Sequence, residues 1–391
     1  MRIAISGAGV AGAALAHWLH RTGHAPTLIE RAPAFRTGGY MIDFWGIGYR
    51  VARQMGIEPA IRDAGYDVQS VRTLGPDGAT QAELRVDVFR RMIGNDFTSL
   101  PRGDLAAAIY RTVEGEVPTV FSDSITGIDQ RPDGVRVTFE NGPATDFDLV
   151  VGADGLHSNV RGLVFGPEER FEHYLGCKVA ACVVDGYRGM TNAEAYLTYS
   201  IPGRQVGQFT LRGGRTMFLF VFRDDHGDHG MTPKEQLHNQ FDNAGWECHE
   251  ILAAVDDVED LFFDVVSQIR MDRWSDDRVL LIGDAAGCIS LLGGEGTGLA
   301  ITEAYALAGE LARAGGDHRR AFASYESLLR PFIEGKQVGA ERMLGFFATR
   351  TRFGLWFRNM ALRTMNLSRP VAGLFTGSVR DDLDLPDYRI G

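Results

Sequence analysis

Cysteine is scarce in this chain, which has 391 residues and four cysteines. Their spacing matches neither the paired thiols of a zinc site nor the dense cross-links of a small secreted domain. We therefore expect no metal site, and reduced, mostly buried thiols that pack as small apolar side chains. The four are Cys177, Cys182, Cys248 and Cys288.

Long apolar runs are also missing. The apolar stretch 217–222 is short and the longer leucine-rich stretches carry charges, so no segment approaches the roughly 20 residues of a membrane span. The chain enters a strand-like segment at once, without the charged region, apolar core and cleavage site of a signal peptide. These features predict a cytoplasmic protein without stable membrane insertion.

A basic excess is lacking as well. The sequence has 40 lysine and arginine residues against 51 aspartate and glutamate residues, a net charge of −11. This balance argues against a nucleic-acid binder and against attraction of the whole chain to an anionic membrane. The length allows one large α/β body with an inserted domain, or two to three folding units.

The most regular pattern that is present begins at the amino end. A short apolar segment, 3–6, runs directly into Gly7-Ala-Gly9-Val-Ala-Gly12, which a helix-like segment follows. In a βαβ unit such glycines permit a tight turn, close approach of a pyrophosphate and close packing of the helix on the strand. Glu30 ends the next strand-like segment, near the spacing of about 20 residues at which an acid binds the adenosine ribose. The pattern predicts a dinucleotide site rather than a glycine-rich turn without a ligand.

A second glycine-rich segment lies far from the first. The strand-like residues 278–282 end in Gly283 and Asp284, and the glycine-rich turn 293–298 precedes a helix-like run over 299–311. A carboxylate beside the N–H groups of a helix amino end offers an anchor for a sugar hydroxyl and for negative charge. The separation of the two segments favours a cofactor longer than NAD, and we expect FAD. The alternative role of Asp284 is that of a helix cap.

The order of the patterns predicts two interleaved domains. Residues 177–222 alternate in the manner of an antiparallel sheet with one covered face, whereas α/β patterns precede and follow them. We expect an α/β fold: a Rossmann-like FAD-binding domain, an inserted, mainly antiparallel substrate domain and a C-terminal bridging helix. The expected boundaries are 1–70, 98–172 and 270–335 for the FAD-binding domain, 71–97 and 173–269 for the substrate domain, and 336–391 for the C-terminal helical segment.

The C-terminal stretch 346–360 is both basic and aromatic. Such a stretch could lie on a membrane surface, but we expect it to pack across both domains with its arginines pointing outward. Earlier in the chain, the patterns predict strand structure across 70–88 and a helix across 232–245.

Three motifs in order are similar to those of a known family. Between the two segments above, a buried-strand pattern ends in Gly152-Ala-Asp154-Gly155-Leu-His-Ser158-Asn-Val-Arg161. With these motifs the chain, from residue 1 to about 340, resembles the single-component FAD-dependent aromatic monooxygenases. That family includes para-hydroxybenzoate hydroxylase and the tetracycline-inactivating monooxygenases. Three separated motifs in order are far more specific than one.

The resemblance implies which residues contact FAD. Asp284 would accept hydrogen bonds from the ribityl or phosphate-linked part of FAD, and backbone groups near Gly296 and Thr297 would face the pyrimidine edge of the flavin. Arg102 would contact the flavin chain or its phosphates. The implied cofactor-binding residues are Gly7, Gly9, Val10, Ala11, Gly12, Glu30, Arg31, Asp43, Arg102, Ile125, Asp154, Gly283, Asp284, Gly294, Gly296 and Thr297.

Further contacts follow from the same resemblance. Arg31 would cover the adenosine ribose, Ile125 would lie under the adenine, and the backbone from Gly39 to Asp43 would approach the flavin ring. Arg161 would either bridge Asp154 to a phosphate or pair with that carboxylate in a structural role. Arg102 has the alternative role of a solvated residue at a helix start.

The chain departs from the family near the flavin. Gly287, Leu291 and Gly298 stand at or near positions where the family usually has a histidine, a proline and an asparagine. We expect these departures to leave FAD binding intact. Without the proline, the loop beside the flavin would be freer or more apolar, which would affect the substrate side of the site.

The resemblance places the substrate under the antiparallel sheet, against the flavin. Aromatic candidates for the walls, for which a core position is the commoner role, are Trp45, Tyr199, Phe209, Phe218 and Phe220. The sequence identifies no catalytic base.

By resemblance the chain is an FAD-dependent monooxygenase that consumes NADPH or NADH. It would form a flavin hydroperoxide with O2 and hydroxylate an aromatic or polyketide-like small molecule. No second Rossmann fingerprint is visible, so the nicotinamide cofactor would visit transiently. The sequence leaves monomer and homodimer open.

Other functions on the same fold stay open. They are a flavin-dependent dehydrogenase, reductase or oxidase, and a flavoprotein that sequesters a ligand without turnover. A halogenase is disfavoured because Gly245-Trp-Glu-Cys248 lacks the second tryptophan and the proline of the usual motif.

Overall fold

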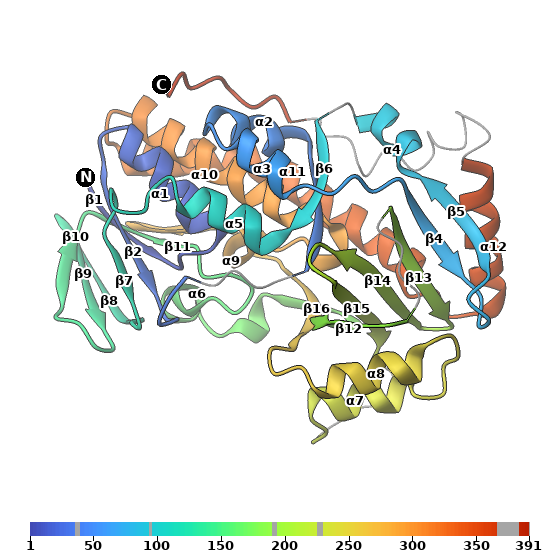
Figure 1. Cartoon of the computed structure of the whole chain (residues 1–391). Helices are drawn as coiled ribbons and strands as arrows, with labels where there is room; N and C mark the ends of the chain where they lie inside the picture. The colour runs from blue at the N-terminus through green and yellow to red at the C-terminus, as the bar shows by residue number, and fades with distance from the viewer. Residues whose placement is uncertain (36–39, 94–95, 190–193, 225–229, 366–382, 391) are drawn as a thin grey trace.

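Two large sheets organise the protein (Figure 1). The computed structural model describes residues 1–35, 40–93, 96–189, 194–224, 230–365 and 383–390. One large sheet is six-stranded and mainly parallel, and the other is seven-stranded and mainly antiparallel. This arrangement confirms the expected α/β fold with a Rossmann-like domain and an inserted antiparallel sheet.

The six-stranded sheet forms the centre of the first domain. In spatial order its strands are β17 (Ser275–Asp276), β18 (Val279–Leu281), β11 (Leu149–Gly152), β1 (Arg2–Ser6), β2 (Ala25–Glu30) and β7 (Thr119–Phe121). All neighbouring strands are parallel except β17 and β18. Strands buried on both faces need apolar side chains throughout, and Ile3 to Ile5 and Leu149 to Val151 are completely buried.

Helices and a small sheet cover this central sheet (Figure 1). The helix α1 (Val10–Arg21) packs on α5 (Arg102–Tyr110) and on α10 (Gly296–Arg313), and α10 also contacts α2 (Gly46–Gln54). The small sheet contains β8 (Ile125–Arg131), β9 (Gly134–Phe139) and β10 (Thr145–Phe147). The helix α6 (Asn159–Val164) contacts β8, β11 and β18.

The seven-stranded sheet forms the second domain. Its strands, in spatial order, are β16 (Phe262–Ile269), β12 (Glu172–Asp185), β15 (Arg215–Arg223), β14 (Arg204–Leu211), β13 (Ala195–Ile201), β4 (Ser70–Leu74) and β5 (Thr80–Arg85). All pairs are antiparallel except β13 and β4. The helices α7 (Pro233–Phe241) and α8 (Cys248–Asp256) cover one face and bury a shared apolar cluster.

Two short strands and one helix lie beside the boundary between the domains. The strands β3 (Met41–Trp45) and β6 (Phe97–Pro101) form an antiparallel pair, and α3 (Glu58–Ala64) packs on β6 and α5. The backbone N–H of Met41 points at the sulfur of Met217 in β15, 3.0 Å away, which joins the pair to the large antiparallel sheet.

The long helix α11 (His318–Phe347) connects both domains (Figure 1). Its amino half packs in the first domain, where Tyr325 and Ile333 are buried. At its carboxyl end Leu344 joins a buried cluster with Val179 of β12 and Val221 of β15. The expected bridging helix is therefore α11, which begins before residue 336.

Three expectations about local structure were wrong. Residues 86–88 are not strand, because the helix α4 (Val86–Ile93) begins there. The helix expected across 232–245 ends at Phe241, and α8, a separate helix, follows. The helix α12 (Arg352–Met365) does not span both domains, since it packs on β5 and β13 of the second. The residue boundaries that we assigned to the domains stay predictions.

None of the helices in the described part of the chain is long and apolar enough to cross a membrane.

Candidate functional site

The glycines of the first motif have steric reasons to be glycine. Gly7 has a φ of +97°, and a Cβ there would lie 2.6 Å from the carbonyl oxygen of Ala153. A Cβ on Gly12 would overlap the carbonyl oxygen of Gly7. The turn between β1 and α1 is therefore pressed against the segment that carries Asp154.

The amino end of α1 is suited to bind an anion. Among the described residues no side chain caps this end, and a Cβ on Gly9 would meet open space. The first N–H groups of a helix attract phosphate, so Val10 and Ala11 begin a helix that could hold a pyrophosphate. At the end of β2 the Glu30 carboxylate accepts hydrogen bonds from the N–H groups of Ala8 at 3.0 Å and Ala32 at 2.9 Å, which fixes it beside the same turn.

Asp154 is tied to its own surroundings. Its carboxylate accepts hydrogen bonds from the hydroxyls of Ser6, at 3.1 Å, and Ser158, at 2.5 Å, and from the N–H of Val160, at 3.0 Å. Burial raises the pKa of Asp154, which these hydrogen bonds oppose. The carboxylate therefore links β1 to the start of α6.

Burial lowers the pKa of Arg161, and the charges of Glu168 and Asp154 oppose that shift, so Arg161 interacts with Asp154 through charge and makes no hydrogen bond to it. The side chain is fully buried and donates to the carbonyl oxygens of Ala285, at 3.1 Å, and Leu156, at 2.7 Å. It also pairs with the Glu168 carboxylate at 2.6 Å. Arg161 thus connects the Asp154 segment to the Gly283–Asp284 segment.

The Gly283–Asp284 turn meets the amino end of α1. Gly283 has a φ of +62°, and a Cβ there would lie 3.2 Å from the Cβ of Ala11. The N–H of Gly283 donates to the carboxylate of Glu303 at 2.6 Å, and the Tyr325 hydroxyl donates to the same oxygen at 2.9 Å. The fold therefore brings the two glycine-rich segments of the sequence together.

Asp284 is half-buried beside the amino end of α10, where a Cβ on Gly296 would lie 3.6 Å from its carboxylate. Burial raises the pKa of Asp284, and the positive charge of Arg102 opposes that shift. Burial likewise raises the pKa of Tyr40 to about 12, with Arg102 opposing and Asp284 adding to the effect. The N–H of Arg102 donates to the carbonyl oxygen of Tyr40 at 2.9 Å, so the start of α5 and the start of β3 lie together.

The glycine turn before α10 is held by a buried ion pair. Gly294 has a φ of +70°, and α10 begins at Gly296 with Glu295 as its N-cap residue. The ammonium of Lys336, on α11, lies 2.7 Å from the Glu295 carboxylate, and the two side chains are 6% and 11% exposed. Among the described residues no side chain caps this end of α10, so no capping side chain competes with a ligand for the first N–H groups of the helix, near Gly296 and Thr297.

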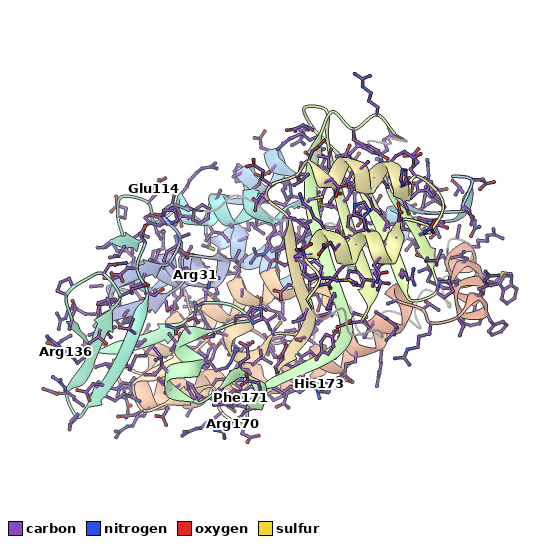
Figure 2. All side chains as sticks on the ribbon, turned by 90° about the horizontal axis from the view of Figure 1, so that it is seen from below. Arg31, Glu114, Arg136, Arg170, Phe171 and His173 are labelled. Carbon is purple, nitrogen blue, oxygen red and sulfur yellow. The ribbon has the colours of Figure 1, made fainter. Side chains whose placement is uncertain are left out.

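Three further residues that were expected to contact the cofactor, Asp43, Ile125 and Arg31, lie in surroundings that differ from one another. Asp43 accepts a hydrogen bond from the Ser99 hydroxyl at 2.5 Å, and burial raises the pKa of Asp43. Ile125 is buried at the start of β8, where its carbonyl oxygen accepts from the Asn159 side chain. Arg31 follows β2 with an exposed side chain (Figure 2). Gly39, whose backbone was expected near the flavin ring, lies outside the described residues.

Three of the five aromatic wall candidates are core residues of the second domain. Tyr199, Phe218 and Phe220 pack against α7 and α8, on the sheet face away from the first domain. Strand alternation places them on one face, and that face is the one that the helices cover. The expectation that they contact substrate is therefore wrong.

The two other candidates face the first domain. Phe209 packs with Met217 beneath partly buried rings, and its ring centroid lies 5.3 Å from that of Tyr66 and 6.2 Å from that of Tyr196. Trp45 lines a small cavity of about 20 Å³ together with Asp43 and Gly294. Trp45 therefore lies beside the glycine turn, whereas Phe209 lies in the aromatic cluster of the second domain.

Packing explains the departure at Gly287 but not the one at Gly298. A Cβ on Gly287 would lie 2.9 Å from a methyl group of Ile333 on α11. A Cβ on Gly298 would lie 3.8 Å from its nearest neighbour, the Cα of Gly48, which is an ordinary contact. Leu291 packs against the cluster that includes Leu344, which makes the loop beside the glycine turn apolar.

Several residues at this site escaped the sequence analysis. Glu303 and Lys336 hold the two turns from α10 and α11, and the carbonyl oxygen of Tyr40 accepts a hydrogen bond from the N–H of Arg102. The first two lie 20 or more positions from the groups they bind, and they carry no local motif that would have identified them.

A cavity of about 560 Å³ lies elsewhere, between the amino ends of β2 and β7 and the small sheet. It contains none of the expected site residues. Ligands of open α/β sheets bind at the carboxyl ends of the strands, where the turns described above converge.

Comparison with known proteins agrees with this geometry. The FAD binding domain family matches residues 1–335. A flavin-dependent monooxygenase from an unknown prokaryotic organism is 34% identical over 400 residues, covering 99% of both chains. The crystal structure of tetracycline destructase Tet(55) is 32% identical with a TM-score of 0.83 and covers 99% of this chain and 98% of its own.

A more distant structure shares the fold. Klebsiella pneumoniae HpxO complexed with FAD and uric acid is 19% identical, with a TM-score of 0.80 over 96% of this chain and 97% of its own. The fold, the converging turns and the matches over the whole length all indicate the same family. This chain therefore belongs to the FAD binding domain family and is an FAD-dependent monooxygenase, an oxidoreductase.

Proposed function

We propose that the protein consumes NADPH or NADH and O2 to hydroxylate an aromatic or polyketide-like small molecule. Tyr40 carries this proposal, because it belongs to two sets of residues. Its ring packs with the aromatic cluster around Phe209 and Met217. Burial raises the pKa of its hydroxyl, and the charges of Arg102 and Asp284 also act on that pKa. An aromatic wall of the second domain thus continues to the residues that we assign to FAD.

The chemistry of this wall suits a flat, partly polar ligand. Tyr66, Tyr196 and Phe97 are partly buried around Phe209, and aromatic faces favour stacked or edge-on aromatic partners. Burial raises the pKa of Tyr196, and the charge of Asp43 raises it further. A neutral phenol and a carboxylate near one another could bind the hydroxyl groups of a phenolic or polyketide ligand.

The residues of the chain would bind and orient the cofactor. We assign the pyrophosphate to the amino end of α1, the adenosine ribose to Glu30, the ribityl chain to Asp284 and Arg102, and the flavin edge to Gly296 and Thr297. Bound FAD would supply electron transfer from the nicotinamide cofactor and activation of O2. The apolar loop at Leu291 and the aromatic wall would keep water from the reacting atoms.

The test is a substrate screen with isotope-labelled oxygen. Phenols, polyketides and tetracyclines, the last suggested by the name of the similar destructase, are tested for stimulated oxidation of NADPH and NADH. Products are then analysed by mass spectrometry under 18O2, and one added 18O atom is the expected result. Oxidised product without 18O would instead identify a dehydrogenase or oxidase. Tight ligand binding with unchanged NAD(P)H consumption and no product would identify a sequestering protein.

A further inference from the structure

The helix α12 points its apolar stripe into solvent. Phe353, Trp356, Phe357 and Met360 are 73%, 57%, 62% and 40% exposed. Their spacing is that of one face of a helix, and the rings of Phe353 and Trp356 stack with centroids 5.8 Å apart. In most surface helices such a stripe faces the core. Here it is an apolar face that the described residues leave open.

The opposite side of α12 is fixed to the second domain. Arg358 is 5% exposed and lies 3.4 Å from the side-chain oxygen of Gln205 in β14. Leu362 is buried with Ala82 of β5, and the guanidinium of Arg363 donates to the carbonyl oxygen of Gln81. These contacts set the rotation of the helix, so the outward direction of the aromatic stripe is built into the fold. The expectation that the arginines of this stretch point outward is therefore wrong at Arg358.

The sequence around the stripe is cationic in an acidic protein. Residues 342–380 contain arginines but no aspartate or glutamate, whereas the whole chain has a net charge of −11. Arg350 and Arg352, at the start of the helix, are exposed. A local positive field beside large apolar side chains is what an interfacial helix presents to anionic lipids.

We propose that α12 docks the protein reversibly on the surface of a membrane that contains anionic lipids. Phe353, Trp356, Phe357 and Met360 enter the boundary between headgroups and acyl chains, and the arginines contact the lipid phosphates. A symmetric contact between two copies of this face would place arginines against arginines, which disfavours a second copy as the occupant.

Vesicle sedimentation of the FAD-loaded full chain tests this proposal. We expect the protein to pellet with vesicles of phosphatidylcholine mixed with phosphatidylglycerol, and not with phosphatidylcholine alone. The double variant Trp356→Gln/Phe357→Ser should weaken binding more than about tenfold, because two aromatic side chains no longer enter the lipid. The variant Arg350→Gln/Arg352→Gln should weaken it about fivefold per arginine and reduce its salt dependence.

The matched control is Met231→Gln, which removes an apolar side chain that is 44% exposed on another part of the second domain. It should bind vesicles as the unchanged protein does. The FAD content and the unfolding midpoint of each variant show whether it is folded, and neither should change, since the substituted side chains face solvent. The proposal is overturned if the unchanged protein does not pellet with anionic vesicles, or if the aromatic variant pellets equally well. It is also overturned if the stripe instead makes a dimer that the aromatic variant dissociates.

Discussion

A guanidinium nitrogen of Arg161 donates a hydrogen bond to the carbonyl oxygen of Ala285, 3.1 Å away. The two residues lie in different motifs, one in α6 after Asp154 and the other directly after Asp284. Arg161 is completely buried and also pairs with Glu168. One buried cation therefore holds two of the three cofactor motifs in a fixed relation.

Replacement of Arg161 by methionine should destabilise the protein and loosen FAD. The variant keeps most of the side-chain volume but leaves the carbonyl oxygens of Ala285 and Leu156 without their guanidinium donors, whereas Glu168 keeps its contact with His157 at 2.7 Å. Loss of the donor to a buried carbonyl oxygen costs about 1–3 kcal/mol. Urea unfolding and the fraction of bound FAD measure the two effects. The control is Arg170→Met, since Arg170 is exposed and stacks on Phe171 at the surface (Figure 2); equal unfolding curves for both variants would contradict the prediction.

Glu303 should make the stability of the apoprotein depend on pH. Burial raises the pKa of Glu303 from 4.5 to about 7, against the hydrogen bonds from Gly283 and Tyr325. The folded state thus holds a proton that the unfolded state releases at lower pH, and stability falls as the pH rises from about 4.5 to about 7. Relative to Glu303→Gln, the unchanged protein should lose roughly 3 kcal/mol across this window.

The measurement is the difference in unfolding free energy between the two proteins at a series of pH values. Tyr325→Phe is the companion variant, because it removes one donor to the ionised carboxylate and should move the window to higher pH. A difference curve that stays flat between pH 4.5 and 7 would show that Glu303 titrates as an ordinary carboxylate.

Asp284→Ala should weaken FAD binding by about 10- to 100-fold, because this factor corresponds to the free energy of the hydrogen bonds that one charged group accepts. Asp284→Asn should lose less, because the amide keeps the shape and one acceptor. FAD fluorescence on titration of the apoprotein measures the affinity. Asp104→Ala is the control, since Asp104 is an exposed acid in the first turn of α5. An Asp284→Ala protein that is purified with full FAD content would remove this residue from the proposed site.

The three motifs could be recognised from the sequence because their glycines are required by the local backbone. Gly7 and Gly283 have a positive φ, and a Cβ on Gly12 would overlap the carbonyl oxygen of Gly7, five positions earlier. Their backbone requirements therefore appear as glycine at fixed spacing. The fold class followed from the same motifs and from strand alternation.

The remaining features depend on partners that no spacing reveals. Strand alternation groups Tyr199, Phe218 and Phe220 correctly on one face, but it does not say which face α7 and α8 cover. The direction of α12 depends on burial of Arg358 beside Gln205, which lies more than 150 positions earlier in the chain. In each case a tertiary contact decided what the local pattern left open.

Removal of one charge of the ion pair between Lys336 and Glu295 should lower the unfolding free energy more than removal of both charges. Lys336→Met removes the ammonium that neutralises a carboxylate only 11% exposed, so we expect a loss of about 3–5 kcal/mol. The double variant Glu295→Gln/Lys336→Met removes both charges and should recover most of that loss, since two neutral side chains avoid the desolvation of an ion. Unfolding free energies of both single variants and of the double variant close the cycle. Because the pair holds the glycine turn before α10, FAD affinity should follow the same order. If the double variant were as unstable as the two single changes added together, the two residues would act independently and the turn would be held by other contacts.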